Sequence, residues 1–197
     1  MKKMIVILLL LLIVMSISSC YAVIRYLDRD AVEQYNKIMK IANEKFCTTS
    51  IEVVSDNNEQ IEEIIGVLKI EKLNIKAPVK RGTSKEILKY SVGWFEESDM
   101  WDGNIALASH NRGSYAHYFE KIHELEAGDE IKYMTNQGIR TYEVIEKIKI
   151  EETNWGKVLE NKGKNTITLV TCITGEKEYR LCIKAIEREE NQYDKKD

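Results

Sequence analysis

The pattern of apolar and polar positions divides the chain into an apolar N-terminal block, a helical stretch, a long body rich in strand signals, and a polar end. Residues Met4 to Ile24 are almost entirely apolar and carry no charge. A run of about 20 apolar residues is long enough for a helix to cross the hydrocarbon core of a bilayer. Lys2 and Lys3 precede the run, as basic residues precede the apolar part of an export signal. We therefore interpret residues 1–24 as an uncleaved signal anchor, which would hold a single-pass protein in the cell membrane with its body outside the cytoplasm.

Two other interpretations of the N-terminus stay open. The segment Ile17-Ser18-Ser19-Cys20 resembles the bacterial lipobox, in which the cysteine is acylated and becomes the new N-terminus. Simple cleavage is the third interpretation, although a small-x-small cleavage site is poorly formed here. The anchor and the lipobox would both tether the chain to a membrane.

Residues 25–60 are expected to form a juxtamembrane helix and then a linker. Apolar residues recur there every three or four positions with charges between them, at Leu27, Ala31, Tyr35, Ile38, Ala42 and Phe46. This is the period of an amphipathic helix. The polar segment from Ser55 to Gln60 has no periodic apolar positions and indicates a linker. At the far end, residues 188–197 are expected to form a solvated polar tail.

Residues 61–187 are the expected folded domain, and their pattern is mainly that of β-strands. Runs rich in β-branched and aromatic residues cover 64–70, 73–79, 104–109, 129–134, 139–150, 165–172 and 179–186. Asn136-Gln137-Gly138 fits a hairpin turn. Helical segments are brief, at 84–88, 115–125 and 155–160. At least seven strands with so little helix predict a closed or nearly closed small β-barrel and not a βαβ sheet.

Charge and motif content exclude several classes of function. The chain has 29 Lys and Arg residues against 32 Asp and Glu residues, a formal net charge of -3. This balance gives no general attraction for nucleic acid, so we expect no nucleic-acid partner. The sequence contains no internal repeat, no glycine-rich phosphate loop and no metal-ligand spacing. We therefore expect no metal and no organic cofactor.

The cysteines and histidines of the body offer a candidate for nucleophilic chemistry. Cys172 ends a strand run and precedes a loop that contains Gly175, which places its sulfur at the mouth of the strand. A cysteine nucleophile needs a basic or cationic partner, and His110 also ends a strand run. Arg180 opens the next strand, where a hairpin would bring a fixed cation close to the thiol. On these facts alone, a structural core thiol remains an alternative for Cys172.

These residues and the segments around them resemble the sortase family of cysteine transpeptidases. The resemblance runs from about Ile64 to Ile186. Its most specific segments are Ser109-His110-Asn111-Arg112-Gly113, Thr168-Leu169-Val170-Thr171-Cys172 and Arg180-Leu181. It implies a sortase-type closed barrel of about eight strands with short helices. The N-terminal anchor and the short 151–164 segment are most similar to class D sortases, with class E as the near alternative.

The resemblance also implies a reaction and its partners. Cys172 would attack the Thr–Gly carbonyl of a Leu-Pro-x-Thr-Gly-type sorting signal on a surface protein, giving a thioacyl-enzyme. His110 would protonate the leaving amine, and Arg180 would stabilise the oxyanion. Thr171, Ser109 and Asn111 are the expected substrate-binding residues. An amine from a peptidoglycan precursor or cross-bridge, as in Gram-positive cell walls, would resolve the intermediate.

Two further functions use the same sequence features. A thiol hydrolase or protease would use the same three residues and pass the acyl group to water. A non-catalytic, membrane-tethered β-barrel binding module would explain the export signal and the strands.

Strand alternation also places Cys182 on the face of Arg180. Cys182 would then either approach the site or serve as a small buried hydrophobic residue.

Overall fold

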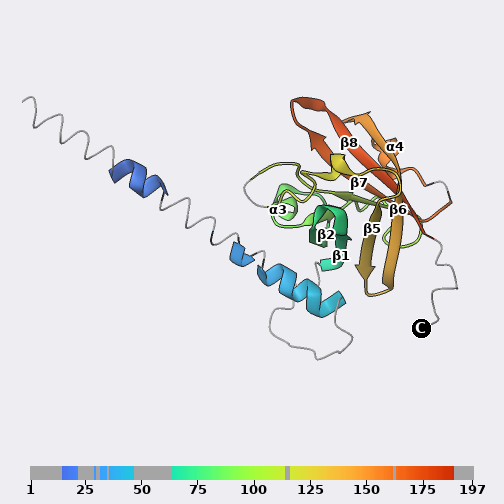
Figure 1. The fold of residues 1–197 in the computed structure, drawn as a ribbon, viewed down its shortest axis with the longest axis horizontal. Helices are drawn as coiled ribbons and strands as arrows, with labels where there is room; N and C mark the ends of the chain where they lie inside the picture. The colour runs from blue at the N-terminus through green and yellow to red at the C-terminus, as the bar shows by residue number, and fades with distance from the viewer. Residues whose placement is uncertain are drawn as a thin grey trace, which may run out of the picture.

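The body of the protein is a closed barrel of eight strands (Figure 1). The computed structural model describes residues 15–21, 29, 32–34, 36–46, 64–113, 116–161 and 163–188. The strands are β1 (Ile64–Ile70), β2 (Ile75–Arg81), β3 (Val92–Trp94), β4 (Asn104–Ala108), β5 (Glu130–Thr135), β6 (Gly138–Glu151), β7 (Thr166–Ile173) and β8 (Glu176–Glu187). Short helices lie between them: η1 (Glu71–Leu73), α3 (Lys85–Leu88), η2 (Ile122–Glu124) and α4 (Trp155–Leu159). The closed mainly β architecture expected from the strand pattern is confirmed.

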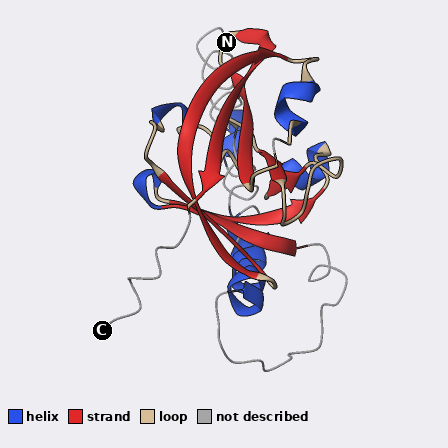
Figure 2. Cartoon of the chain, turned by 90° about the vertical axis from the view of Figure 1, so that its right-hand side faces the viewer, coloured by secondary structure: helices blue, strands red, loops and turns tan. Residues whose placement is uncertain are grey.

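The strands follow the order β1-β2-β3-β4-β7-β8-β6-β5 around the barrel, with β5 returning to β1. Two neighbouring pairs, β2 with β3 and β4 with β7, run parallel, and the others run antiparallel. Figure 2 shows the long strands curving around the closed sheet. The parallel pair of β4 and β7 determines which residues can meet, because parallel neighbours end at the same edge of a sheet.

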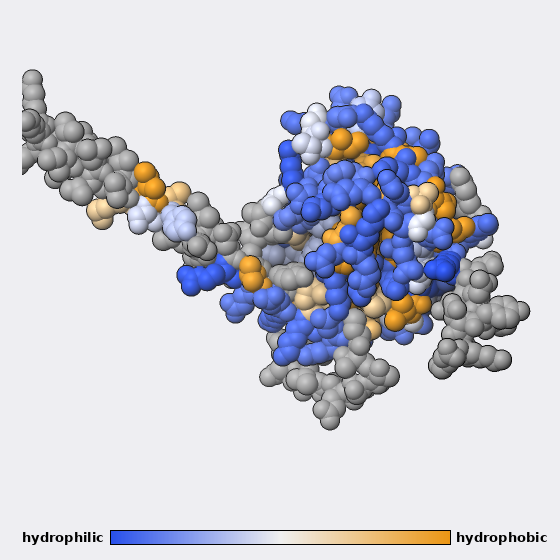
Figure 3. Space-filling model, viewed as in Figure 1, coloured by the Kyte–Doolittle hydropathy of each residue, from blue (hydrophilic) through white to orange (hydrophobic). Residues whose placement is uncertain are grey.

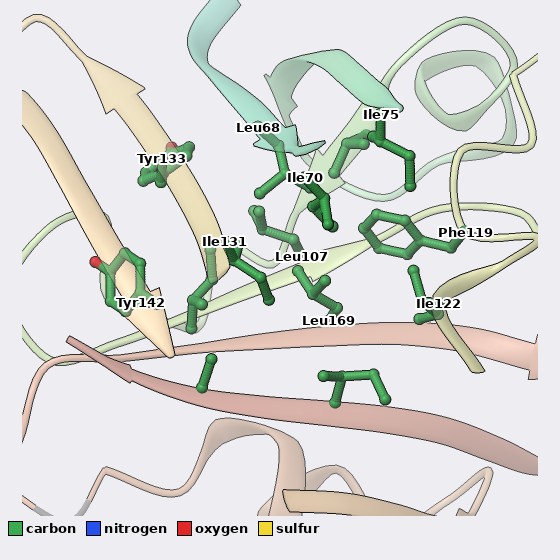
Figure 4. Close-up of a cluster of buried hydrophobic side chains, with 14 of the residues drawn as sticks. Leu68, Ile70, Ile75, Leu107, Phe119, Ile122, Ile131, Tyr133, Tyr142 and Leu169 are labelled. Carbon is green, nitrogen blue, oxygen red and sulfur yellow. The ribbon is translucent and has the colours of Figure 1, made fainter. Parts of the chain in front are cut away.

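Apolar side chains fill the inside of this barrel. Figure 4 shows side chains from several strands converging there, with Phe119 and Ile122 of the segment after β4 packed against them. Leu107 of β4 and Leu169 of β7 are fully buried, and they alternate along their strands with residues of the opposite face. Each buried aliphatic or aromatic side chain contributes roughly 1.5–3 kcal/mol relative to exposure. Figure 3 shows that hydrophilic residues dominate the visible surface of the barrel, with smaller apolar patches between them.

The helix of residues 36–46 packs against the barrel instead of standing away from it. Ile38 and Ala42 are buried, with 6% and 0% of their surfaces exposed, against Val67 of β1 and Met134 of β5. Lys45 donates from Nζ to the carbonyl of Ile64 over 2.9 Å. The amphipathic period that predicts this helix therefore also marks its contact face.

The expected elements need two corrections. A helix expected at 115–125 is replaced by turns that lead into η2, and its apolar residues Phe119 and Ile122 close the barrel end. Strand β3 was not expected, because three residues are too short for a recognisable period. It forms because Val92 and Trp94 are buried between β2 and β4.

Most of the anchor expected in residues 1–24 lies outside the described residues. Within the described parts of the chain, no helix has both the length and the apolar character that crossing a membrane requires. The linker at 48–60 and nearly all of the tail at 188–197 also lie outside the described residues.

Candidate active site

His110 and Cys172 lie at the same end of the barrel because their strands are parallel neighbours. Ala108, the last residue of β4, is in register with Val170 of β7. The pairing continues beyond β4, where the N–H of Ser109 donates to the carbonyl of Val170 over 3.3 Å. Continuing this register one residue further puts His110 beside Cys172, on chain segments about 5 Å apart. Cys172 is exposed and His110 is half-buried, so a ligand can reach both.

Hydrogen bonds fix the two segments to each other on both sides of His110. The hydroxyl of Thr171 donates to the carbonyl of Ser109 over 2.8 Å in a buried position. On the other side, Nδ2 of Asn111 donates to the carbonyl of Cys172 over 2.7 Å and to the hydroxyl of Thr174 over 3.2 Å. The carbonyl of His110 accepts from the N–H of Phe119 over 3.1 Å. The backbone that carries the imidazole is therefore held against the backbone that carries the thiol.

The three expected substrate-binding residues have these internal contacts in the structure. Ser109 and Thr171 are both 4% exposed, whereas Asn111 is half-buried beside the thiol. The hydroxyl of Ser109 is buried without a hydrogen-bond partner. Their role toward a substrate stays a prediction, while their role in holding the site together follows from the bonds described above.

Arg180 faces Cys172 directly across the β7–β8 hairpin. The two residues are register partners, so their side chains project from the same face of the sheet. Its NH1 donates to the carbonyls of Lys177 and Tyr179, both over 2.8 Å, and its NH2 pairs with the carboxylate of Glu152 over 3.0 Å. The Arg180 side chain is only 18% exposed. It is a fixed cation beside the thiol, held by partners on two neighbouring strand ends.

An apolar floor lies on the same face as Cys172 and Arg180. Val170 and Cys182, which are register partners, continue this face one step further from the strand ends. The buried residues of the floor are Ala106, Ile150, Val158, Val170 and Cys182. Phe95, Ile148 and Leu159 pack against them. Val158 and Leu159 belong to α4, so the segment between β6 and β7 covers part of the floor.

A cavity of about 410 Å³ opens beside Cys172 toward the other face. Thr171 and Leu181 line it, and they alternate along β7 and β8 with Cys172 and Arg180. The complete lining consists of Asn111, Arg112, Phe119, Glu120, His123, Thr171, Cys172, Ile173, Thr174 and Leu181. Cys172 therefore stands at the boundary between the apolar floor and a cavity whose lining includes both polar and apolar side chains.

The two cysteines of the barrel have different environments. Burial raises the pKa of the Cys182 thiol to about 11, which keeps it protonated at neutral pH. Cys172 is exposed, and neither cysteine forms a disulfide. Cys182 thus lies on the face of the site, as strand alternation predicts, but as a buried part of the apolar floor. Cys47 lies outside the described residues.

Some residues near the site were not identified from the sequence. Glu152 reaches Arg180 only because β6 and β8 are paired neighbours, and nothing in its local sequence indicates this contact. His123 lines the cavity beside Cys172, a position that its local sequence did not indicate. Within the described residues, no group of His, Cys, Asp or Glu side chains has the arrangement of a metal site.

Comparison with known proteins identifies the family of this chain. Residues 68–187 match the family model of the sortase domain. The chain is 32% identical over 114 residues to sortase A of Bacillus anthracis, covering 57% of this chain and 54% of that protein. It is 28% identical over 109 residues to sortase D of Bacillus subtilis (strain 168), covering 54% and 53% of the two chains. The matched region thus spans about half the length of these curated relatives.

Among solved structures, the chain resembles a sortase D5 transpeptidase from Clostridium perfringens. The TM-score is 0.58 with 28% sequence identity, covering 67% of this chain and 86% of that chain. The family model covers more than half of the chain, and it includes His110, Cys172 and Arg180. The resemblance seen in the sequence is therefore confirmed, and this chain belongs to the sortase family.

Proposed function

We propose that this protein is a membrane-anchored, extracytoplasmic cysteine transpeptidase. The observation that carries the proposal is the register of β7 with both its neighbours. It sets Cys172 opposite Arg180 on one side, and beside the segment of His110 on the other. A nucleophile, a proton carrier and a fixed cation then surround one reacting carbon, which is the combination that acyl transfer requires.

Each residue has a distinct role in the proposed reaction. The sulfur of Cys172 attacks the carbonyl carbon of the Thr–Gly bond in a Leu-Pro-x-Thr-Gly-type signal. His110 gives a proton to the departing amine, so that a thioester remains on Cys172. Arg180 stabilises the negative oxygen of the tetrahedral intermediate, for which its position across the hairpin is suited. An amine of the cell wall or its precursor then attacks the thioester and releases the joined product.

The apolar floor supports a peptide donor. An extended segment with a leucine and a proline needs an apolar surface that leads to the reacting sulfur, and Val170, Ala106 and Cys182 form such a surface next to Cys172. The covering segment with α4 would have to adjust to admit the peptide, because Val158 is fully buried on this floor. The expected role of Thr171, Ser109 and Asn111 in substrate binding is part of this proposal, and their internal hydrogen bonds would also keep the backbone around the donor in place.

The class of sortase is part of this proposal. Likeness to sortase D of Bacillus subtilis and to the sortase D5 transpeptidase of Clostridium perfringens supports class D. Class E is the alternative from the sequence. The expected anchor in residues 1–24 would place the barrel on the outer face of the cell membrane, where both the surface proteins and the wall amines are found.

Mass spectrometry of the full chain in detergent tests the proposal. The protein is incubated with a panel of Leu-Pro-x-Thr-Gly-type pentapeptides, with and without triglycine as an amine. We expect a thioacyl adduct on Cys172 that triglycine converts into a new amide. Cys172→Ala should form no adduct, and Lys40→Ala, which changes an exposed residue of the helix of residues 36–46, is the control that should still form it.

The same experiment separates the other functions. An adduct that only water resolves, with no amide at any triglycine concentration, would make the protein a thiol hydrolase. No adduct with any peptide, together with a Cys172 thiol that resists alkylation, would overturn the catalytic proposal and favour a binding module.

A further inference from the structure

We propose that the cavity beside Cys172 binds the amine acceptor, and that the carboxylate of Glu120 recognises the acceptor's ammonium group. This inference rests on the proposed transpeptidase function. It adds the location of the second substrate and the side chain that selects it.

The two faces of the sheet at Cys172 differ in a way that suits two different substrates. In a transpeptidase the donor peptide supplies the carbonyl carbon that forms the thioester, and the acceptor amine must then reach that carbon. The apolar floor lies on the face shared by Cys172 and Arg180, and it matches an apolar donor peptide. The cavity lies toward the opposite face, behind Thr171 and Leu181, and it remains open beside the thiol. An acceptor in the cavity could therefore approach the thioester without displacing the acyl chain.

The polar groups among the lining residues of the cavity suit an amine. The residues that line it include one carboxylate, Glu120, two neutral oxygen-bearing side chains, Asn111 and Thr174, and the imidazole of His123. The Glu120 side chain is 54% exposed, and its carboxylate is 3.4 Å from Nε2 of His117. A carboxylate that is reachable from solvent and lines the same cavity as Cys172 attracts a cation.

A cationic side chain also lines the cavity, and it limits the kind of acceptor that would fit. Arg112 lines the cavity together with Glu120. The ammonium of Lys147 lies nearby but is already bonded to the carbonyls of His123 and Leu125, over 2.8 and 3.1 Å. An acceptor that has both an ammonium and a carboxylate would satisfy both Glu120 and Arg112. We therefore infer an amino-acid-type amine, and not a simple alkylamine.

The transfer step balances without any further reactant. The acceptor binds as an ammonium ion and gives one proton to solvent before it reacts. Its nitrogen attacks the thioester carbon, the carbon–sulfur bond breaks, and an amide bond forms. The second proton leaves the nitrogen through His110 and is available to the departing sulfur of Cys172.

Kinetics of the full chain with preferred donor peptide and varied acceptor test the inference. Glu120→Gln removes the charge but keeps the shape. We expect it to raise the acceptor KM for triglycine roughly 3- to 10-fold, the range for loss of a partly exposed charged hydrogen bond. The rate of thioacyl formation should stay unchanged. Hydroxylamine, which is uncharged at neutral pH, should resolve the adduct equally well in both proteins.

Two controls separate this effect from a general loss of structure. Glu143→Gln removes an exposed carboxylate on β6 that does not line the cavity, and it should leave the acceptor KM unchanged. Lysine and 1,5-diaminopentane differ by a single carboxylate, and lysine should be the better acceptor. Arg112→Gln should remove that preference.

The outcomes distinguish this inference from the proposed function. If Cys172 never forms a thioacyl adduct, the transpeptidase proposal fails. If the adduct forms and triglycine resolves it, but Glu120→Gln leaves the acceptor KM unchanged, only the acceptor site is overturned. The acceptor site would also be overturned if Glu120→Gln raised the hydroxylamine concentration needed to resolve the adduct as much as it raised the KM for triglycine. Recognition of a charge cannot explain an effect on an uncharged nucleophile.

Discussion

Asn111 joins the two halves of the candidate site through its side-chain amide, which donates to the carbonyl of Cys172 over 2.7 Å. It follows His110 directly in the chain, so this bond connects the segment of the imidazole to the strand end of the thiol. A second bond from the same amide reaches Thr174 in the turn of the β7–β8 hairpin. The side chain thus acts at the point where β4 and β7 separate.

Loss of this bridge should reduce turnover more than it reduces stability. Asn111→Ala removes a donor at an accessible position, which should lower the free energy of unfolding by only about 1 kcal/mol. The imidazole and the thiol would lose their fixed separation, so we expect kcat for thioacyl formation to fall roughly tenfold or more. Peptide cleavage kinetics and thermal unfolding of the same protein measure both effects. A decrease in kcat that only follows the loss of folded protein would contradict a positioning role.

Turnover should depend on the planar guanidinium group of Arg180 and not on its charge alone. NH1 and NH2 of this side chain have separate partners, the carbonyls of the hairpin and the carboxylate of Glu152. A lysine has the charge but not the two-directional geometry. We expect Arg180→Lys to lower kcat by about 10²-fold, in the range seen when an oxyanion donor is lost. Single-turnover kinetics measure the effect, and near-normal turnover would show that charge alone is sufficient.

Glu152 offers a milder variant at the same contact. Glu152→Gln keeps a hydrogen-bond acceptor but removes the charge from a group that is 51% exposed. The stability cost should be below about 1 kcal/mol, as for surface ion pairs. Turnover should fall less than in Arg180→Lys, because the two carbonyl bonds of Arg180 remain. A larger loss in the glutamate variant than in the arginine variant would contradict this order.

The protein should lose stability between about pH 9 and 11, in part through Cys182. Burial raises the pKa of this thiol to about 11 from a usual value of 9.0. The unfolded chain therefore loses the proton first as pH rises, and ionisation then favours unfolding. Urea unfolding at several pH values should show a falling free energy over this interval. In Cys182→Ala the free energy of unfolding should fall less over this interval. An unchanged fall would show that other groups cause the loss of stability.

Thiol labelling should separate the two cysteines at neutral pH. Cys172 is exposed and should react with an alkylating reagent, whereas Cys182 is fully buried and should react only after unfolding. Peptide mapping by mass spectrometry identifies the labelled residue. Labelling of Cys182 in the folded protein would show that the apolar floor opens on the timescale of the reaction.

Gly66 should be intolerant of any side chain. A Cβ at this position would lie 2.7 Å from the carbonyl oxygen of Met134 and 2.8 Å from the ring of Tyr133. Because one of these atoms is backbone, β1 and β5 would have to separate, and Gly66→Ala should cost roughly 1–3 kcal/mol. Gly156 in α4 is the control, since its nearest atom would be 3.9 Å away. Gly156→Ala should be neutral or stabilising by up to about 1 kcal/mol.

The docked helix should contribute to the stability of the barrel. Ile38 is buried against β1 and β5, so Ile38→Ala should cost roughly 2 kcal/mol or more. Lys40→Ala changes an exposed position of the same helix and should cost less than about 0.5 kcal/mol. Chemical unfolding of the full chain compares the two. Equal costs would show that the helix does not pack stably on the barrel.

Much of the site could be recognised from the sequence because its residues stand at the ends of strands. The runs that end near His110 and Cys172 are long enough to show a strand pattern, and a polar or reactive residue after such a run is unusual. The amphipathic period through Ile38 and Ala42 likewise predicts a helix with a contact face. The sequence alone did not determine the surface against which this face packs, because β1 and β5 meet only in the folded barrel.

The tertiary structure decided what depends on pairing between distant strands. The contact between Glu152 and Arg180 exists because β6 lies beside β8, and the cavity with His123 and Glu120 exists because the segment after β4 folds across the barrel end. That segment was expected to be helical, yet burial of Phe119 and Ile122 in the barrel outweighs its local preference. Local sequence therefore determined most of the strands and the family, and it identified the candidate reactive residues. The closure of the sheet determined which partners surround them, because burial and register act over the whole barrel and not along one segment.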